Sequence, residues 1–253
     1  MQAARLPLLL LATLTACAIH VPPPKIIPEG APPPERAWEN LLSRHVDDQG
    51  RIDFAGIAQE PANLEAYVAW IAKVSPAFSP ESFPTTEAKL AYYINSYNAL
   101  AVYDVIQSGF PPDLNAVKVR FFYRNRLEMG GKFTSLYTLE NKVIRPIGDP
   151  RVHVALNCMA RGCPRLPREP FTAAELDAQL EREARHFYNE ERNVRLEPEK
   201  KTVFLSQILQ FYTEDFLKKA PSLIEYVNRY REEKIPSGWK VDFIPYDWNL
   251  NKQ

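Results

Sequence analysis

The sequence predicts an α+β fold: a single domain in which helices pack around a small, mostly antiparallel sheet. Three observations indicate this class. Long segments carry apolar residues at helical spacing, short segments alternate apolar and polar residues between turn signals, and no repeat or clear domain boundary follows Pro34. The chain has 253 residues, of which 45% are hydrophobic and 25% charged, so it can bury one sizeable core.

Several segments predict helices from their hydrophobic spacing. The longest comprises residues 87–109, because Thr85 or Thr86 can cap its start and Gly109 is a common terminating residue. Two of the others begin with a capping box, in which a hydroxyl residue is followed three positions later by glutamate. The remaining expected helices comprise residues 37–46, 62–74, 135–145, 171–189, 207–219 and 222–233.

Short strands are predicted in the middle of the chain and near its end. Residues 116–122 alternate in hydrophobicity, and Gly130-Gly131 suits a hairpin turn. Residues 193–206 have the pattern of a hairpin closed by a Pro-Glu-Lys-Lys turn. The apolar run at residues 151–156 is expected to form a buried strand.

The N-terminus has the features of a secreted, lipid-anchored protein. Residues 1–16 hold an early arginine and an apolar run too short to span a bilayer, which is typical of a signal peptide. The sequence LTAC resembles the bacterial lipobox and implies cleavage before Cys17, with a lipid on its thiol. Residues 17–37 are rich in proline and predict an extended linker to a globular domain at 38–253.

This anchor implies where the protein is located and what it contacts. Ala18 after the lipidated cysteine is similar to outer-membrane lipoproteins, so we expect a bacterial cell-envelope protein, held by lipid on Cys17 and facing the periplasm. Lys and Arg together number 31, as do Asp and Glu, so no basic excess favours a nucleic acid partner. The sequence has no glycine-rich phosphate loop and no His-Glu-x-x-His motif, and we expect neither a cofactor nor a metal. The expected partners are the membrane and an envelope protein, peptide or small molecule.

Three stretches together resemble a known family. They are YINSYNALAVYDVI, GGKFTSLYTLENKVIR and RVHVALNCMARGCPRL. In their order and separation they are similar to the bacterial and plant family catalogued as domain of unknown function 547, over residues 38–217. The family implies no established reaction. It usually has small or serine residues between its two cysteines, but Met159-Ala160-Arg161-Gly162 stands here, so no role for a serine carries over.

The two cysteines of the third stretch allow two interpretations. In an oxidising compartment Cys158 and Cys163 could form a disulfide that closes a small loop. Alternatively, Cys158 is a nucleophile with His153 as its base, oriented by Asn157 or Glu140. In an extended strand His153 and Cys158 would face opposite ways, which argues against a direct pair.

A binding cleft is the other candidate site. In papain- and transglutaminase-like folds, a helix packs against a sheet that carries a catalytic histidine. Here the long helix would bring Asn95, Tyr97 and Asn98 towards His153, although it has no cysteine. Arg145 would complete the cleft, and Arg145 and Glu140 could form an ion pair with each other or orient His153. Two classes of function stay open: an envelope binding or assembly module, and a cysteine-dependent hydrolase or acyl-transfer enzyme. The sequence favours the first, because no nucleophile has an evident base.

Overall fold

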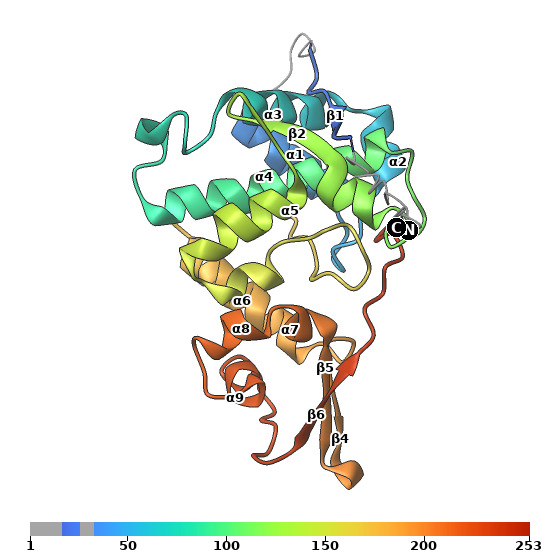
Figure 1. Ribbon diagram of the computed structural model, residues 1–253, viewed down its shortest axis with the longest axis vertical. Helices are drawn as coiled ribbons and strands as arrows, with labels where there is room; N and C mark the ends of the chain where they lie inside the picture. The colour runs from blue at the N-terminus through green and yellow to red at the C-terminus, as the bar shows by residue number, and fades with distance from the viewer. Residues whose placement is uncertain (1–16, 26–32) are drawn as a thin grey trace, which may run out of the picture.

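The computed structural model describes residues 17–25 and 33–253 (Figure 1). The predicted signal peptide, residues 1–16, and part of the expected linker lie outside the described residues. The α+β class is confirmed: helices predominate, and the strands form two small sheets of three strands each. Each sheet is mixed, with one parallel and one antiparallel pair, instead of the expected single and mostly antiparallel sheet. No helix in the described part of the chain is long and apolar enough to cross a membrane.

The helices and strands have the following bounds. The α-helices are α1 Pro34–His45, α2 Phe54–Gln59, α3 Ala62–Lys73, α4 Thr86–Gln107, α5 Leu136–Thr138, α6 Leu176–Asn189, α7 Gln207–Phe211, α8 Thr213–Leu217 and α9 Leu223–Asn228. The strands are β1 Ile19–Val21, β2 Asn125–Met129, β3 Lys132–Thr134, β4 Val194–Glu197, β5 Thr202–Ser206 and β6 Lys240–Ile244. The 3-10 and π turns that position the site are η2 Val119–Arg124, η3 Leu139–Ile144 and η5 Pro150–Val154.

Helix α4 forms as its sequence predicts. The hydroxyl of Thr85 accepts a hydrogen bond from the backbone N–H of Ala88 at 3.1 Å, so the expected N-cap is in place. The helix ends just before Gly109, whose φ of 75° is in the left-handed region. Most of its residues are buried, because α1 and α3 lie on one side of it and α5 on another (Figure 1).

Two predicted strands are turns of helix instead. Residues 119–124 form the π turn η2, in which Phe121 alone is buried, so the alternation did not mark a sheet face. Residues 150–154 form the 3-10 turn η5, because Pro150 lacks an N–H and the Asp149 carboxylate accepts from the N–H of Arg151. The expectation that His153 and Cys158 face opposite ways on an extended strand is therefore wrong.

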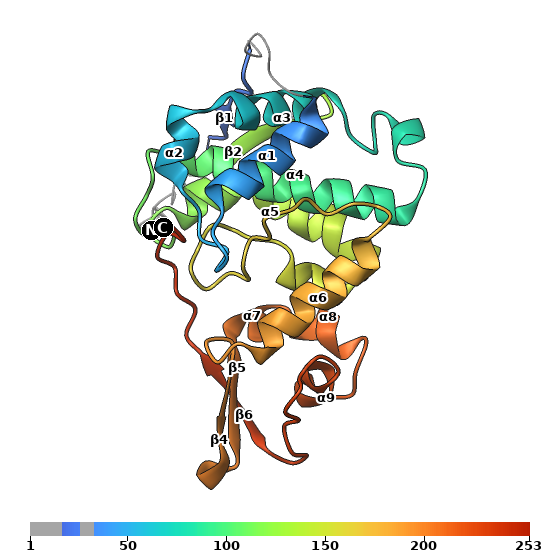
Figure 2. The ribbon, with the colours of Figure 1, turned by 180° about the vertical axis from the view of Figure 1, so that it is seen from behind.

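The second sheet contains the predicted hairpin and a return strand. β4 and β5 pair antiparallel from Val194↔Leu205 to Glu197↔Thr202, which confirms the hairpin. β6 then pairs parallel to β5. After β6 the chain runs back towards the half of the molecule that holds α1 to α4 (Figure 2). On the way, Leu250 forms a β-bridge with Ala160 in the cysteine loop.

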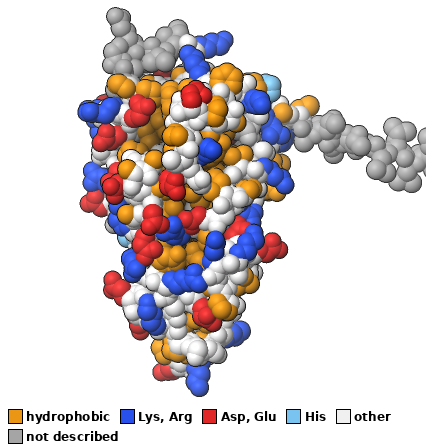
Figure 3. All heavy atoms as spheres, turned by 90° about the vertical axis from the view of Figure 1, so that its left-hand side faces the viewer, with side chains coloured by type: hydrophobic (Ala, Val, Ile, Leu, Met, Phe, Trp, Pro, Cys, Tyr) orange, Lys and Arg blue, Asp and Glu red, His pale blue; other side chains and the backbone are white. Residues whose placement is uncertain are grey.

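The hydrophobic core has two clusters that meet at η5. Val152 belongs to the cluster around α1, α3 and α4, whereas Val154 belongs to the cluster around α9 and the second sheet. His153 lies between them in the chain, so two packed regions fix its position. On the surface, Figure 3 shows charged side chains of both signs scattered over one long face, with hydrophobic side chains between them.

The segment after Cys17 lies against the domain. β1 pairs parallel to β2, with Ile19 opposite Asn125. The hydroxyl of Tyr103 donates to the carbonyl of Pro22 at 2.9 Å. Where a freely extended linker was expected, the first described residues of that segment thus form the edge of a sheet.

Candidate functional site

One pocket brings the cysteine loop and η5 together. It has a volume of about 290 Å³, and His153, Cys158 and Cys163 all line it. Aromatic rings cover much of its wall, which gives it an apolar body with a few polar groups, the usual composition of a ligand site. These rings include Phe122, Tyr123, Tyr137, Phe211, Tyr212 and Trp248.

At one end of the pocket, His153 is held by a carboxylate. Its Nε2 lies 3.0 Å from Oδ2 of Asp215 in α8, and its ring stacks on Tyr212 with centroids 3.9 Å apart. Asp215 also accepts from Arg145 Nε at 2.7 Å and from Lys218 Nζ at 3.0 Å. The hydrogen bond from His153, with those from Arg145 and Lys218, holds the pKa of Asp215 well below its usual range. We name this group, His153, Asp215, Arg145 and Tyr212, the imidazole end.

Glu140 lies beside this end without orienting the histidine. It is buried in η3, and the hydroxyl of Tyr97 lies 3.4 Å from its Oε2. Burial raises the pKa of Tyr97 well above its ordinary value, and the Glu140 carboxylate adds to that rise. Arg145 forms its ion pair with Asp215 instead of the expected Glu140, and its guanidinium also donates to Asn141 at 2.6 Å. The residue that orients His153 is thus Asp215 instead of the Glu140 or Asn157 considered from sequence.

At the other end of the pocket, two thiols and a phenol are in contact. Cys158 Sγ and Cys163 Sγ lie 2.7 Å apart, and the Tyr246 hydroxyl lies 3.1 Å from the first and 3.0 Å from the second. Both cysteines are free, so the expected disulfide is not formed; a disulfide bond measures about 2.05 Å. We name these three residues the thiol end.

The two thiols differ in acidity. Burial raises the pKa of Cys163, but hydrogen bonds from the Cys158 thiol and the Tyr246 hydroxyl outweigh it and leave that pKa below its ordinary value. The backbone N–H of Cys158 also donates to Cys163 Sγ, at 2.9 Å. The pKa of Cys158 is raised, first by its hydrogen bond to Cys163 and then by burial. If one thiol of the pair ionises near neutral pH, it is therefore Cys163.

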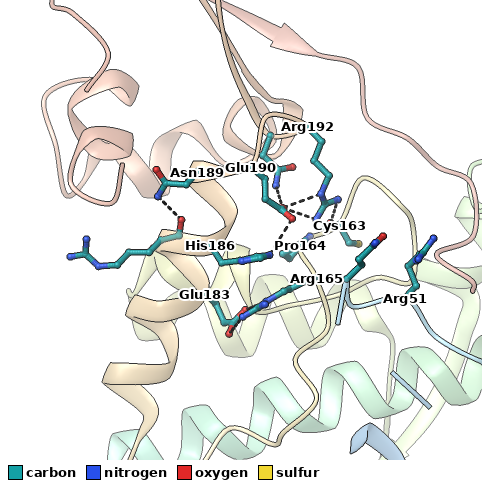
Figure 4. A network of polar contacts seen from close by, with 12 residues as sticks. Arg51, Cys163, Pro164, Arg165, Glu183, His186, Asn189, Glu190 and Arg192 are labelled. Carbon is teal, nitrogen blue, oxygen red and sulfur yellow. Dashed lines mark hydrogen bonds and ion pairs between the residues drawn. The ribbon is translucent and has the colours of Figure 1, made fainter. Parts of the chain in front are cut away.

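The cysteine loop is fixed from behind by side chains. Asn157 Nδ2 donates to the carbonyl of Pro164 at 2.7 Å, which closes the loop on itself. Arg192 donates to the carbonyl of Cys163 at 3.2 Å and forms an ion pair with Glu190 at 2.9 Å (Figure 4). Asn157 is thus a structural residue of the loop, and its amide does not contact His153.

The C-terminal segment places Tyr246. The N–H of Gly162 donates to the carbonyl of Asp247 at 2.8 Å, and the N–H of Arg161 donates to the carbonyl of Asn249 at 2.8 Å. A Cβ on Gly162 would come within 2.9 Å of the Tyr246 ring, so only glycine allows this approach. Two backbone hydrogen bonds therefore fix the phenol beside the sulfurs.

The candidate residues on α4 divide between structure and pocket. Asn95 donates to the carbonyl of Phe171 at 2.7 Å and accepts from its N–H at 3.0 Å. Asn98 accepts from the N–H of Asn157 at 2.8 Å. Both amides thus satisfy buried backbone groups and neither lines the pocket, whereas Tyr97 does.

The residues that contact His153 and the cysteines through long-range packing were missed from sequence: Asp215, which lies behind His153 and does not line the pocket, and Tyr246, which does line it. Asp215 lies 62 residues from His153, and Tyr246 lies 88 residues from Cys158. Tyr246 is in a C-terminal stretch without hydrophobic periodicity, and Asp215 is one of two acids in a predicted helix. Within residues 17–25 and 33–253, no three His, Cys, Asp or Glu side chains cluster as metal ligands would.

Comparisons with known proteins give a family and no function. A family model described as "Protein of unknown function, DUF547" matches residues 80–188. This range is narrower than residues 38–217, but it contains α4, both cysteines and His153. No curated protein and no solved structure matches the chain. Residues 80–188 of this chain therefore match the DUF547 family, whose function is unknown.

Proposed function

We propose that this chain is a lipid-anchored protein of the bacterial cell envelope, facing the periplasm, whose pocket binds a small molecule or one side chain of a peptide. The pocket at the cysteine loop is the observation that supports the proposal. Its volume of about 290 Å³ is close to the lower limit of roughly 300 Å³ for ligand sites, which suits a compact ligand.

The polar groups of the pocket suggest how such a ligand would be oriented. Arg145 lies over the Tyr212 ring at 5.0 Å, and Lys118 lies over the Trp248 ring at 4.4 Å. Both cations and Glu140 line the pocket. A ligand with an apolar body and a terminal polar group would stack on the rings and hydrogen-bond at the charged end.

Binding is favoured over catalysis by the state of His153. Its Nε2 is occupied by Asp215, and no hydrogen bond in the described part of the chain joins its imidazole to either thiol. A general base has to come within hydrogen-bond reach of the proton it takes, directly or through one water. The resting geometry therefore holds the histidine as a wall of the pocket.

A pair of matched phenylalanine variants tests ligand binding. Small molecules and short peptides would be screened by the rise in unfolding temperature they cause. Phe211 lines the pocket and is 47% exposed, whereas Phe78 is 67% exposed and lies outside it. Phe211→Ala should weaken any hit by about tenfold, since it removes one aromatic contact, and Phe78→Ala should not. Equal affinities in the two variants would place the ligand elsewhere.

The surroundings of Cys17 support the anchor. Cys17 is exposed, and Arg124 donates to its carbonyl at 3.1 Å. The segments nearby carry exposed apolar side chains at Val119, Tyr123 and Phe133. A lipid on Cys17 would thus hold the domain close to the bilayer, with these side chains at the interface.

Metabolic labelling tests the anchor. Cells given labelled palmitate should label the wild-type protein, which should sediment with membranes. Cys17→Ser should lose both the label and the sedimentation, while Cys163→Ser, the control for loss of a thiol, should keep both. An unlabelled wild-type protein in the soluble fraction would disprove the anchor.

A cysteine-dependent hydrolase or acyl-transfer enzyme that uses Cys158 and His153 is the second candidate. It is supported by the His153–Asp215 pair and the thiols that line one pocket. With 4-nitrophenyl acetate, an enzyme would release nitrophenol over many turnovers and lose this activity in His153→Gln. A binding protein would be acetylated once at most, with no effect of that variant.

A further inference from the structure

The thiol end has chemistry that ligand binding does not need. An apolar pocket wall could be built without sulfur, yet here two thiols and a phenol share one set of contacts. Cys158 is half-buried, and although Cys163 is 3% exposed, both sulfurs line the pocket. A compound that enters the pocket would therefore reach them.

We propose that Cys158 and Cys163 form a reactive dithiol that reduces disulfides of small thiol compounds by thiol–disulfide exchange. Cys163 is the attacking sulfur and Cys158 the resolving sulfur. The proposal rests on the contacts of the sulfurs and does not require the ligand proposed above.

The contacts assign the two roles. Cys163 Sγ accepts from the backbone N–H of Cys158 at 2.9 Å and contacts the hydroxyl of Tyr246 at 3.0 Å, so a negative charge on this sulfur is stabilised. Cys158 Sγ stands 2.7 Å from it. Bond formation between the two sulfurs requires an approach of less than about 1 Å, since a disulfide measures about 2.05 Å.

The exchange proceeds in two balanced steps. The Cys163 thiolate attacks one sulfur of the incoming disulfide, RSSR; the bond between its sulfurs breaks, a mixed disulfide forms, and RS⁻ leaves and takes up a proton. Cys158 then loses its proton and attacks Cys163 Sγ, which expels the second RS⁻. Two electrons and two protons pass from the cysteines to RSSR, giving one intramolecular disulfide and two RSH.

The surrounding fold favours the second step. The loop between the cysteines is held by Arg192 and by the backbone pair between Gly162 and Asp247. The resolving sulfur thus stays beside the attacked one while the substrate is bound. This proximity makes release of the mixed disulfide faster than attack by a second external thiol.

The experiment uses the Cys17→Ser protein, which removes the exposed third thiol, and 5,5′-dithiobis(2-nitrobenzoate) as the disulfide. The reduced protein should release two thionitrobenzoate ions per chain. It should end with no bound thionitrobenzoate and with a mass lower by two hydrogen atoms. With Cys158→Ser, one ion should be released and one label should stay on Cys163. With Cys163→Ser, the reaction should be about tenfold slower or more, because the backbone N–H of Cys158 stabilises a thiolate on Cys163 and is lost to the thiol that remains.

Each contrary result is decisive. Two labels bound to the reduced protein would mean that the thiols react independently, and equal rates for the two serine variants would overturn the roles. Both variants are then repeated in guanidinium, where their rates should become equal because the folded contacts are lost. If each variant reacts at the same rate in the native state as in guanidinium, the folded contacts do not affect the thiols, and the proposal is overturned. Loss of ligand binding in Phe211→Ala leaves this readout interpretable, since the label count needs no ligand.

Discussion

The two ends of the pocket stabilise charge in opposite ways. At the imidazole end, Asp215 accepts from His153, Arg145 and Lys218 at 2.7 to 3.0 Å, so a full negative charge faces two cationic side chains and an imidazole N–H. At the thiol end, Cys163 accepts from a backbone N–H, and its side-chain neighbours are another thiol and a phenol. No cationic side chain donates to either sulfur in the part of the chain that the structure describes.

This difference indicates which end can change state. Charges that are paired at short distance are costly to separate, so the carboxylate of Asp215 stays ionised and the imidazole end keeps one geometry. Neutral donors stabilise a thiolate less strongly than cations do, so the thiol end is the end whose protonation can change. The imidazole end thus shapes the pocket, and the thiol end is where chemistry is expected.

The largest expected pH dependence of the unfolding free energy comes from Asp104, outside the pocket, and it has to be removed before the two ends are compared by pH. Burial raises the pKa of Asp104, on α4 away from the pocket, to about 7, even though Asn125 donates to it. The folded state then binds more protons than the unfolded state between about pH 4 and 7, so this group lowers stability as pH rises through that window. Unfolding in urea should show that Asp104→Asn is more stable than the wild type at pH 8. The difference in unfolding free energy should grow from pH 4 to pH 8 by up to about 4 kcal/mol.

The same measurement identifies a contrary result. Asn resembles the protonated acid, so the two proteins should be nearly equal at pH 4. A constant difference across the range would mean that Asp104 is ionised throughout and contributes nothing to the pH dependence of stability between pH 4 and pH 8.

Removal of the central carboxylate should affect the imidazole end strongly. Asp215→Ala leaves Arg145 and the buried His153 without their acceptor and should cost about 3 kcal/mol of unfolding free energy in urea at pH 7. The pKa of Asp215 is depressed, so its contribution is present above about pH 4 and is lost as pH falls below that value.

Lys218→Gln is the matched control for this prediction. Lys218 contacts the same carboxylate, but its side chain is 69% exposed, so its loss should cost less than about 1 kcal/mol. Similar small losses in both variants would show that paired charge does not hold this end, and the contrast between the two ends would fail.

The fold was predictable where the signal was local. Thr85 and Gly109 mark the ends of α4 through capping and a left-handed turn, and both effects depend on a few adjacent residues. The segments at 116–122 and 151–156 were misread as strands because a short apolar run suits both strands and turns. For the second, Pro150 after Asp149 was a usable signal, since a proline with a capping aspartate favours a tight helical turn.

Only the residues whose chemical type indicates reactivity could be predicted from the sequence as parts of the site. His153 and the cysteine pair stand out in the sequence, and the structure brings them to one pocket. Asp215 and Tyr246 complete the two ends, yet each reaches its partner through tertiary packing across 62 or more residues. Periodicity reports which face of an element is buried and says nothing about which distant element covers it.

The smallest expected effect on stability is also the most specific test of the thiol end. Tyr246→Phe keeps the ring and removes the hydroxyl that lies 3.0 Å from Cys163 Sγ. Unfolding free energy should fall by about 1 kcal/mol or less, the usual net value of one hydrogen bond. The pKa of Cys163 should rise, because one stabilising contact with the thiolate is lost. The rate of alkylation by iodoacetamide, followed against pH in Cys17→Ser protein, should reach its midpoint at a higher pH. An unchanged midpoint with full stability would show that Tyr246 packs against the sulfurs without tuning them. The lowered pKa of Cys163 would then depend on the thiol and the backbone N–H of Cys158.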